Sequence, residues 1–350
     1  MPWLPPLLLH YYITGRCNSR CGICDIWRES TGASARLEDV ARNLASAARL
    51  GLRFVDFTGG EPLLHPDLAQ MLKLARSAGL RTTLTTNTLL YPERAAELAG
   101  LVDFLHFSLD AASADDHDQL RGVPCFAAVM TSIDRARQYG ERPDILFTAQ
   151  SSTLHHLPHL AEFCQRLGLI LIVNPVFSHR QLRELSSADL AVIEQYACKP
   201  FVYVNRALHR LRRQGGNHTT APRCRVVDGV VVISPQNELI LPCFHHEAER
   251  IPLDPGLEAV WKGAEVYRQR LMQGRRSECE GCTLNCYFDP SFTYRFDRFF
   301  VQSLAAKAKY SIEKYLRHPL MKSARQMDLR PAAAIMAELQ GSQDSLREAL

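Results

Sequence analysis

Three cysteines within eight residues constrain this chain more than any other feature. They are Cys17, Cys21 and Cys24, in the stretch CNSRCGIC, and no fourth cysteine lies close to them in the sequence. Closely spaced thiolates bind zinc or iron–sulfur clusters, and a closed structural zinc site takes four ligands. Three thiolates on a four-iron cluster leave one iron open to an exogenous ligand. The spacing therefore predicts a [4Fe–4S] site that binds and reduces a substrate, rather than three buried thiols that pack as small hydrophobic groups.

Composition limits the class of protein. The 350 residues are enough for one large α/β domain and a smaller module. The net charge of +4 gives no sign of a nucleic-acid partner. No apolar run is long enough to span a membrane, and the N-terminal stretch lacks the basic region of a signal peptide. We therefore expect a cytoplasmic protein, in which eleven cysteines indicate metal binding or catalysis rather than disulfides.

β-rich runs alternate with helical patterns over the first half of the chain. The alternation indicates βαβ units and a parallel sheet. Six strands are too few for a closed eight-stranded barrel, so we predict an open (β/α)6 partial TIM barrel with helices outside. The predicted strands are 7–14, 52–58, 80–86, 102–110, 144–152 and 169–175, and predicted helices include 37–50, 66–79 and 157–168.

The second half of the chain predicts a different organisation. A charged helical stretch is expected over 182–213, followed by a loop-like linker and then by a β-hairpin over 225–243 with its turn near Pro235, Gln236 and Asn237. The last sixty residues have a helical pattern. These features predict a barrel domain over 1–215, a small module of a β-hairpin and helices over 216–290, and a helical extension over 291–350.

Strand alternation predicts which side chains point into the barrel. Polar residues recur at every second position of three strands, so they share one face, while the apolar residues between them meet the helices. We interpret Asp56 and Thr83 as core hydrogen-bonding groups. The inward set is Asp56 and Thr58, then Thr83, Thr85 and Asn87, and then His106, Ser108 and Asp110.

Together, these stretches resemble the radical S-adenosylmethionine superfamily. The resemblance rests on the CxxxCxxC loop after the first strand, on FTGGEP at 57–62, on TTN at 85–87 and on FSLDA and HDQLRG within 107–122. It implies that the open iron of the cluster is chelated by S-adenosyl-L-methionine. It also implies that the methionine moiety contacts Gly59, Gly60 and Glu61, and that further contacts to this cofactor come from Asn87, Ser108, Asp110 and Arg121.

A second group of cysteines follows the first by two hundred residues. Two of them bracket the predicted hairpin, and the others lie in a CxxC stretch and just beyond it. The pattern resembles the superfamily's twitch module, a shortened SPASM domain, and this implies an auxiliary [4Fe–4S] cluster. The implied ligands are Cys224, Cys243, Cys279 and Cys282. Cys286 is either free or replaces one of these four, and a zinc site is the alternative to the cluster.

The segment 295–325 places Phe296, Phe300, Leu304, Ile312 and Tyr315 near one helical face, with mostly basic charges. Such a helix either covers the core or lies in a membrane interface as a peripheral contact with the inner surface of the membrane.

The resemblance implies a biosynthetic enzyme that forms a 5′-deoxyadenosyl radical and abstracts hydrogen from an unactivated carbon. It implies a flavodoxin- or ferredoxin-type electron donor, and a small-molecule, lipid-like or peptide substrate. The type of reaction stays open between dehydrogenation, epimerisation and bond formation. Because no recognition domain is evident before Cys17, we expect a small-molecule or lipid-like substrate, with maturation of a ribosomal peptide as the alternative. The rival from another class is a non-enzymatic electron carrier or redox sensor, but a carrier needs no Gly59-Gly60-Glu61-Pro62 stretch.

Overall fold

A single ten-stranded sheet organises the protein. The computed structural model describes residues 5–29, 32–177, 184–317 and 327–348. The strand order is β10-β9-β8-β1-β2-β3-β4-β5-β6-β7, and the sheet does not close. The six predicted strands are all present and parallel, which confirms the partial barrel. They are β1 Leu8–Thr14, β2 Phe54–Gly59, β3 Arg81–Thr86, β4 Phe104–Ser108, β5 Asp144–Ala149 and β6 Leu171–Pro175.

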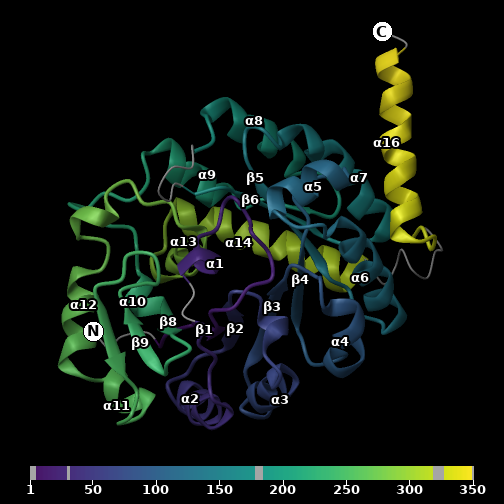
Figure 1. Cartoon of the computed structure of the whole chain (residues 1–350). Coiled ribbons are helices and arrows are strands. Elements are labelled where there is room, and N and C mark those ends of the chain that lie inside the picture. Colours follow the sequence, from purple (N-terminus) through teal and green to yellow (C-terminus); the bar gives the residue numbers. More distant parts are fainter. Residues whose placement is uncertain (1–4, 30–31, 178–183, 318–326, 349–350) are drawn as a thin grey trace.

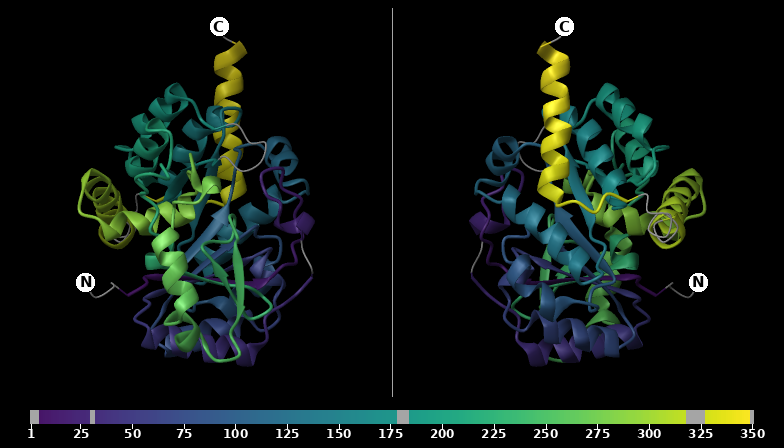
Figure 2. Two further views of the ribbon diagram at one scale, coloured as in Figure 1. Left: turned by 90° about the vertical axis from the view of Figure 1, so that its left-hand side faces the viewer. Right: turned by 90° about the vertical axis from the view of Figure 1, so that its right-hand side faces the viewer.

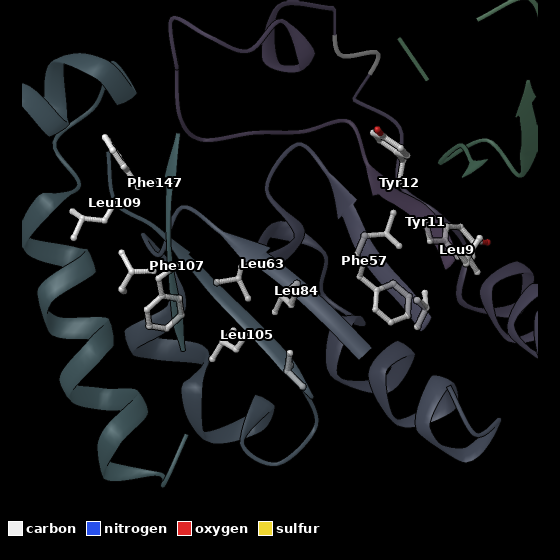
Figure 3. Packing of buried hydrophobic residues seen from close by; sticks show 14 of the residues in the cluster. Leu9, Tyr11, Tyr12, Phe57, Leu63, Leu84, Leu105, Phe107, Leu109 and Phe147 are labelled. Atoms are coloured by element: carbon white, nitrogen blue, oxygen red, sulfur yellow. The ribbon is translucent and has the colours of Figure 1, made fainter. Parts of the chain in front are cut away.

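Helices cover the outside of this barrel (Figure 1). They are α2 Leu37–Arg49, α3 Leu68–Ser77, α4 Tyr91–Leu98, α5 Ala114–Arg121, α6 Phe126–Gln138 and α7 Leu157–Leu167. Alternate strand residues such as Phe57, Leu84 and Phe107 are fully buried in the hydrophobic core (Figure 3). The residues between them carry the polar inner face: His10 lies 2.9 Å from Asp56, and Thr85 lies 3.3 Å from His106.

The C-terminal hairpin extends the barrel sheet. Its strands are β8 Val230–Ile233 and β9 Glu238–Leu241, and Asn237 in the turn has a positive φ of 61°. β8 pairs in parallel with β1, so β1 is flanked by the barrel on one side and by the hairpin on the other. A third strand, β10 Glu249–Pro252, pairs antiparallel with β9 and was not predicted. Residues 226–229, expected in the hairpin, form the short helix α10 Val226–Gly229 instead.

The prediction of one helical stretch over 182–213 is wrong in its middle, where a short strand interrupts it. Residues 182–183 lie outside the described residues. Helices α8 Ser187–Tyr196 and α9 Arg206–Arg213 are separated by a two-residue strand, β7 Val202–Tyr203, which pairs with β6. Pro200 cannot continue a helix, and Phe201 after it has a left-handed φ of 56°. The chain therefore turns at these two residues and continues as β7 at the edge of the sheet.

The last part of the described chain is helical, as predicted. Its helices are α11 Leu257–Trp261, α12 Ala264–Met272, α13 Asn285–Ser291, α14 Arg298–Ser311, a π-helical continuation Ile312–Arg317, and α16 Ala332–Glu348. α16 packs against α6 and α7 and then projects from the body (Figure 2). Residues 318–325 of the predicted amphipathic segment lie outside the described residues. None of the described helices has the length and apolar character that a membrane span requires.

Candidate active site

The first three cysteines lie in the loop between β1 and the short helix α1 Ile26–Glu29. The backbone amide of Ser19 points to the sulfur of Cys17 at 3.4 Å, and the indole nitrogen of Trp27 donates to the carbonyl of Cys21 at 3.1 Å. Burial raises the pKa of the Cys17 thiol to about 11 and also raises the pKa of Cys24. A metal must therefore displace protons from these thiols when it binds.

Gly59 and Gly60 allow the loop after β2 to pack directly on the cysteine loop. The amide of Gly60 donates to Thr14 O and that of Glu61 to Arg16 O, both at 2.8 Å. A Cβ atom on Gly59 would lie 2.1 Å from Thr14 O, and one on Gly60 would lie 2.0 Å from Arg16 O. Only glycine fits such an approach, so both glycines are required by the contact between these loops.

Glu61 and Asn87 connect three of the barrel loops. The buried carboxylate of Glu61 accepts hydrogen bonds from the hydroxyl of Thr86 at 2.7 Å and from the amides of Asn87 and Leu63 at 2.8 and 3.1 Å. Burial raises the pKa of Glu61, against the effect of these donors. The side-chain amide of Asn87 in turn donates to Ser19 Oγ at 2.8 Å. The cysteine loop is thus joined to the ends of β2 and β3.

Asp110 and Arg121 connect the loop after β4 to the same place. Arg121 Nη2 lies 2.6 Å from Asp110 Oδ2, and its Nη1 lies 3.7 Å from the sulfur of Cys21. The end of α5 also docks on the cysteine loop, because the amide of Arg20 donates to Arg121 O at 2.9 Å. Ser108, the last residue of β4, is buried at the same end of the strand.

The residues predicted to bind the first cofactor therefore converge at the carboxyl ends of β1 to β4. One neighbour was not predicted. His117 Nδ1 accepts a hydrogen bond from the amide of Asp110 at 3.1 Å, and burial lowers the pKa of this imidazole to about 3. A neutral histidine at this position holds the Asp110 loop without adding charge beside Arg121.

The second set of cysteines surrounds a small enclosed cavity beside the barrel. Cys224, Cys243, Cys279 and Cys282 all line it, together with apolar side chains such as Leu284 and Phe288, whereas Cys286 does not. Burial raises the pKa of Cys243 to about 12 and that of Cys282 to about 11. The four cysteines implied as ligands are thus brought together, and Cys286 sits in α13 outside the cavity wall.

Asn217 holds the loops of this second set in place, a role that was not predicted. Its side-chain nitrogen donates to Gly274 O at 2.8 Å and to Cys279 O at 3.1 Å. Its side-chain oxygen accepts from the amides of Arg223 and Cys224 at 2.9 and 3.2 Å. Every hydrogen-bonding group of this fully buried amide is used, so Asn217 fixes the position of two cysteine-bearing segments relative to each other.

The spacing of the sulfur atoms bears on the kind of group they could hold. Around a zinc ion, with Zn–S distances of about 2.3 Å, sulfur atoms lie only about 3.8 Å apart. Among the cysteines, all of which the structure describes, no three sulfur atoms lie within 4.8 Å of one another. Neither set is therefore drawn together around a single ion in this structure.

Comparison with known proteins agrees with this arrangement. The family model of the radical SAM superfamily matches residues 11–164. A probable GTP 3′,8-cyclase of Methanococcus maripaludis is 29% identical over 189 residues, which cover 52% of this chain and 63% of that protein. An AdoMet-dependent heme synthase of Methanosarcina barkeri is 26% identical over 325 residues, which cover 81% of this chain and 92% of that protein.

Two solved structures share the fold, including strands and helices beyond the matched region. Streptococcus suis SuiB has a TM-score of 0.62 at 19% identity, over 80% of this chain and 71% of that one. The enzyme anSMEcpe with bound AdoMet and a peptide has a TM-score of 0.60 at 17% identity, over 89% and 98% of the two chains. With its cysteine loop at the mouth of an open parallel barrel, the part of the chain that the family model matches, residues 11–164, is a radical SAM domain.

Proposed function

We propose that Cys17, Cys21 and Cys24 ligate the family's [4Fe–4S] cluster and that S-adenosylmethionine occupies its open iron. The proposed cofactor site is formed by Gly59, Gly60, Glu61, Asn87, Ser108, Asp110 and Arg121. The observation that carries the proposal is the direct connection of the cysteine loop to these residues, through Gly60 and Glu61 to its backbone and through Arg121 to Cys21. An electron carrier without a methionine site would not need this convergence.

When bound, the cluster supplies the electron that cleaves the sulfonium of S-adenosylmethionine to methionine and a 5′-deoxyadenosyl radical, which takes hydrogen from an unactivated carbon. The chain's own residues bind, orient and exclude water. A carboxylate has about four acceptor positions, and Glu61 uses three of them on Thr86, Asn87 and Leu63. The remaining position suits the ammonium group of the methionine moiety.

We further propose that Cys224, Cys243, Cys279 and Cys282 hold an auxiliary [4Fe–4S] cluster with no open iron. The support is that all four cysteines line one cavity. Such a cluster would carry electrons or shape the substrate site, and its potential would depend on burial and on hydrogen bonds near sulfur. The electron for the first cluster would come from a flavodoxin- or ferredoxin-type donor.

For the substrate, we propose a small molecule. The support is the heme synthase relative, whose similarity extends over most of both chains. The alternative is a peptide, supported by fold similarity to SuiB bound to its precursor peptide and to anSMEcpe bound to peptides. Cleavage of S-adenosylmethionine, measured with candidate small molecules and with candidate peptides, would separate the two classes. The class that contains the substrate should stimulate formation of 5′-deoxyadenosine.

The decisive experiment is anaerobic reconstitution followed by dithionite and S-adenosylmethionine. We expect 5′-deoxyadenosine from the wild type, and none from the variant in which Cys17, Cys21 and Cys24 are alanine. That variant should keep about half of the iron, because the second set of cysteines is intact. Glu61→Ala should keep the cluster and bind S-adenosylmethionine about ten- to a hundredfold more weakly in calorimetry. Absence of 5′-deoxyadenosine from fully reconstituted wild type would favour an electron carrier.

A further inference from the structure

The outer side of α14 and its π-helical continuation carries a continuous exposed apolar stripe. Val301, Leu304, Ile312 and Leu316 are exposed to 53%, 54%, 54% and 62%. Their spacing of three, four or eight residues puts them on one side of the helix. We define the α14 stripe as Val301, Leu304, Ala305, Ala308, Ile312 and Leu316, all of which are exposed. Phe296, just before the helix, is 85% exposed.

The opposite side of the same helix is firmly attached to the barrel. Lys314 Nζ lies 2.7 Å from Asp144 Oδ1, Tyr310 donates to the same carboxylate at 2.6 Å, and Lys309 donates to Val202 O at 2.7 Å. Asp144 begins β5, so α14 lies at the amino ends of the strands, away from the cysteine loop. Figures 1 and 2 show α14 (yellow-green) on the face opposite the purple segment that contains α1. The stripe therefore points outward in a fixed orientation.

Positive charge accompanies the stripe. Residues 295–317 hold six basic and two acidic side chains, a net charge of +4 that equals the net charge of the whole chain. The rest of the sequence is therefore neutral on balance. Lys309 and Lys314 face the barrel, and Lys307 is paired with Asp289 at 3.0 Å. The exposed basic residues near the stripe are therefore Arg295, Arg298 and Arg317. A free anion would be bound by the charges alone, whereas apolar and basic groups on one helix face together match the surface of an anionic bilayer.

We propose that this face binds an anionic lipid bilayer. The α14 stripe and Phe296 insert at the boundary between headgroups and acyl chains, and Arg295, Arg298 and Arg317 contact lipid phosphates. Because α14 and the cysteine loop lie on opposite faces, a bilayer bound here leaves the mouth of the barrel open to water. The bilayer thus holds the enzyme in place and does not deliver a lipid to the site.

Cosedimentation of the full-length protein with vesicles tests the proposal. We expect binding to vesicles of phosphatidylcholine with phosphatidylglycerol, and little binding to phosphatidylcholine alone. Leu304→Glu with Ile312→Glu should weaken binding by about tenfold or more, since affinity scales with the buried apolar area. Replacing Arg295, Arg298 and Arg317 by Gln should weaken binding and reduce its dependence on salt. A matched control is Leu271→Glu on α12, because Leu271 is equally exposed at 52% but lies outside the stripe.

Three results would overturn the proposal. The first is absence of binding to the anionic vesicles, and the second is binding that the stripe variants leave unchanged. The third is a concentration-dependent dimer that Leu304→Glu abolishes, because it would assign the stripe to contact with a second copy of the chain. Formation of 5′-deoxyadenosine by every variant verifies that the fold is intact. Its absence from wild type would count against the proposed function and leave the vesicle result unaffected.

Discussion

The guanidinium of Arg121 lies 2.6 Å from the carboxylate of Asp110, and both groups are almost completely buried. Removal of one member of a buried ion pair leaves an unpaired charge and costs about 3–5 kcal/mol. We expect Asp110→Ala to lower the free energy of unfolding of the cluster-free protein by about this amount, measured by urea denaturation. Asp110→Ala combined with Arg121→Leu should recover most of the loss. Equal instability of the single and double variants would show that the charge is not the cause.

Gly60→Ala should separate the cysteine loop from the loop after β2. The added Cβ would lie 2.0 Å from Arg16 O, so one backbone must move. We expect loss of most 5′-deoxyadenosine formation and a stability cost of about 1–3 kcal/mol. Gly22→Ala is the matched control, because Gly22 lies inside the cysteine loop and its Cβ would meet nothing within 4 Å. Equal activity of both variants would contradict a role for close packing.

Asn217→Ala should empty the second site selectively. It removes the partner of Gly274 O and of the amides of Arg223 and Cys224, each at a cost of about 1–3 kcal/mol where buried, whereas Cys279 O keeps the amide of Cys282 at 3.3 Å. Iron content should fall by about half, with S-adenosylmethionine cleavage retained. Asn217→Asp keeps the acceptor for Arg223 and Cys224 but loses both donors, so an intermediate iron content is expected. Full iron in Asn217→Ala would show that the loops do not need this side chain.

Cys286→Ser should behave differently from Cys282→Ser. Cys282 lines the cavity of the second site and Cys286 does not. We therefore expect Cys286→Ser to keep full iron and an unchanged electron paramagnetic resonance signal, and Cys282→Ser to lose the auxiliary signal. The reverse pattern would assign Cys286 as the ligand in place of Cys282.

Acid should destabilise the cluster-free protein partly through His117. Its pKa is lowered to about 3 in the fold by burial, whereas a histidine in an unfolded chain titrates near 6.5. Between these values the unfolded state binds a proton that the folded state does not, so the unfolding free energy falls as pH falls through this window. From about pH 7 to about pH 5 the loss from this group is roughly 2 kcal/mol.

Denaturation of His117→Asn at both pH values measures this contribution. Asn can accept the hydrogen bond from the amide of Asp110 without titrating, so we expect a smaller loss of stability on acidification. A pH dependence of His117→Asn equal to that of the wild type would exclude His117 as its source.

Much of the barrel could be predicted because its signals are local. The strands around Phe57 and Phe107 alternate between apolar and polar residues, and parallel strands bring their carboxyl ends to one edge. Glu61, Asn87 and Asp110 each follow one of these strands in the sequence, so their convergence at that edge could be predicted.

Other features depend on contacts that no local pattern encodes. Asn217 is a single asparagine in a linker, and its partners Gly274 and Cys279 lie about sixty residues away. The buried pair of Lys314 with Asp144 joins residues 170 positions apart. Lys314 therefore looks like one more basic residue of a surface helix until the fold is known.

The pairing of β1 with both β2 and β8 also determines how the two cysteine sites can move. One strand carries the first site at its end and supports the hairpin of the second along its side, so a continuous backbone ladder spans both. No linker separates them along that ladder, and any hinge between the sites would have to break sheet hydrogen bonds. Electron tunnelling falls steeply with distance. β1 would therefore keep the distance between the two proposed clusters constant, and with it the rate of electron transfer between them.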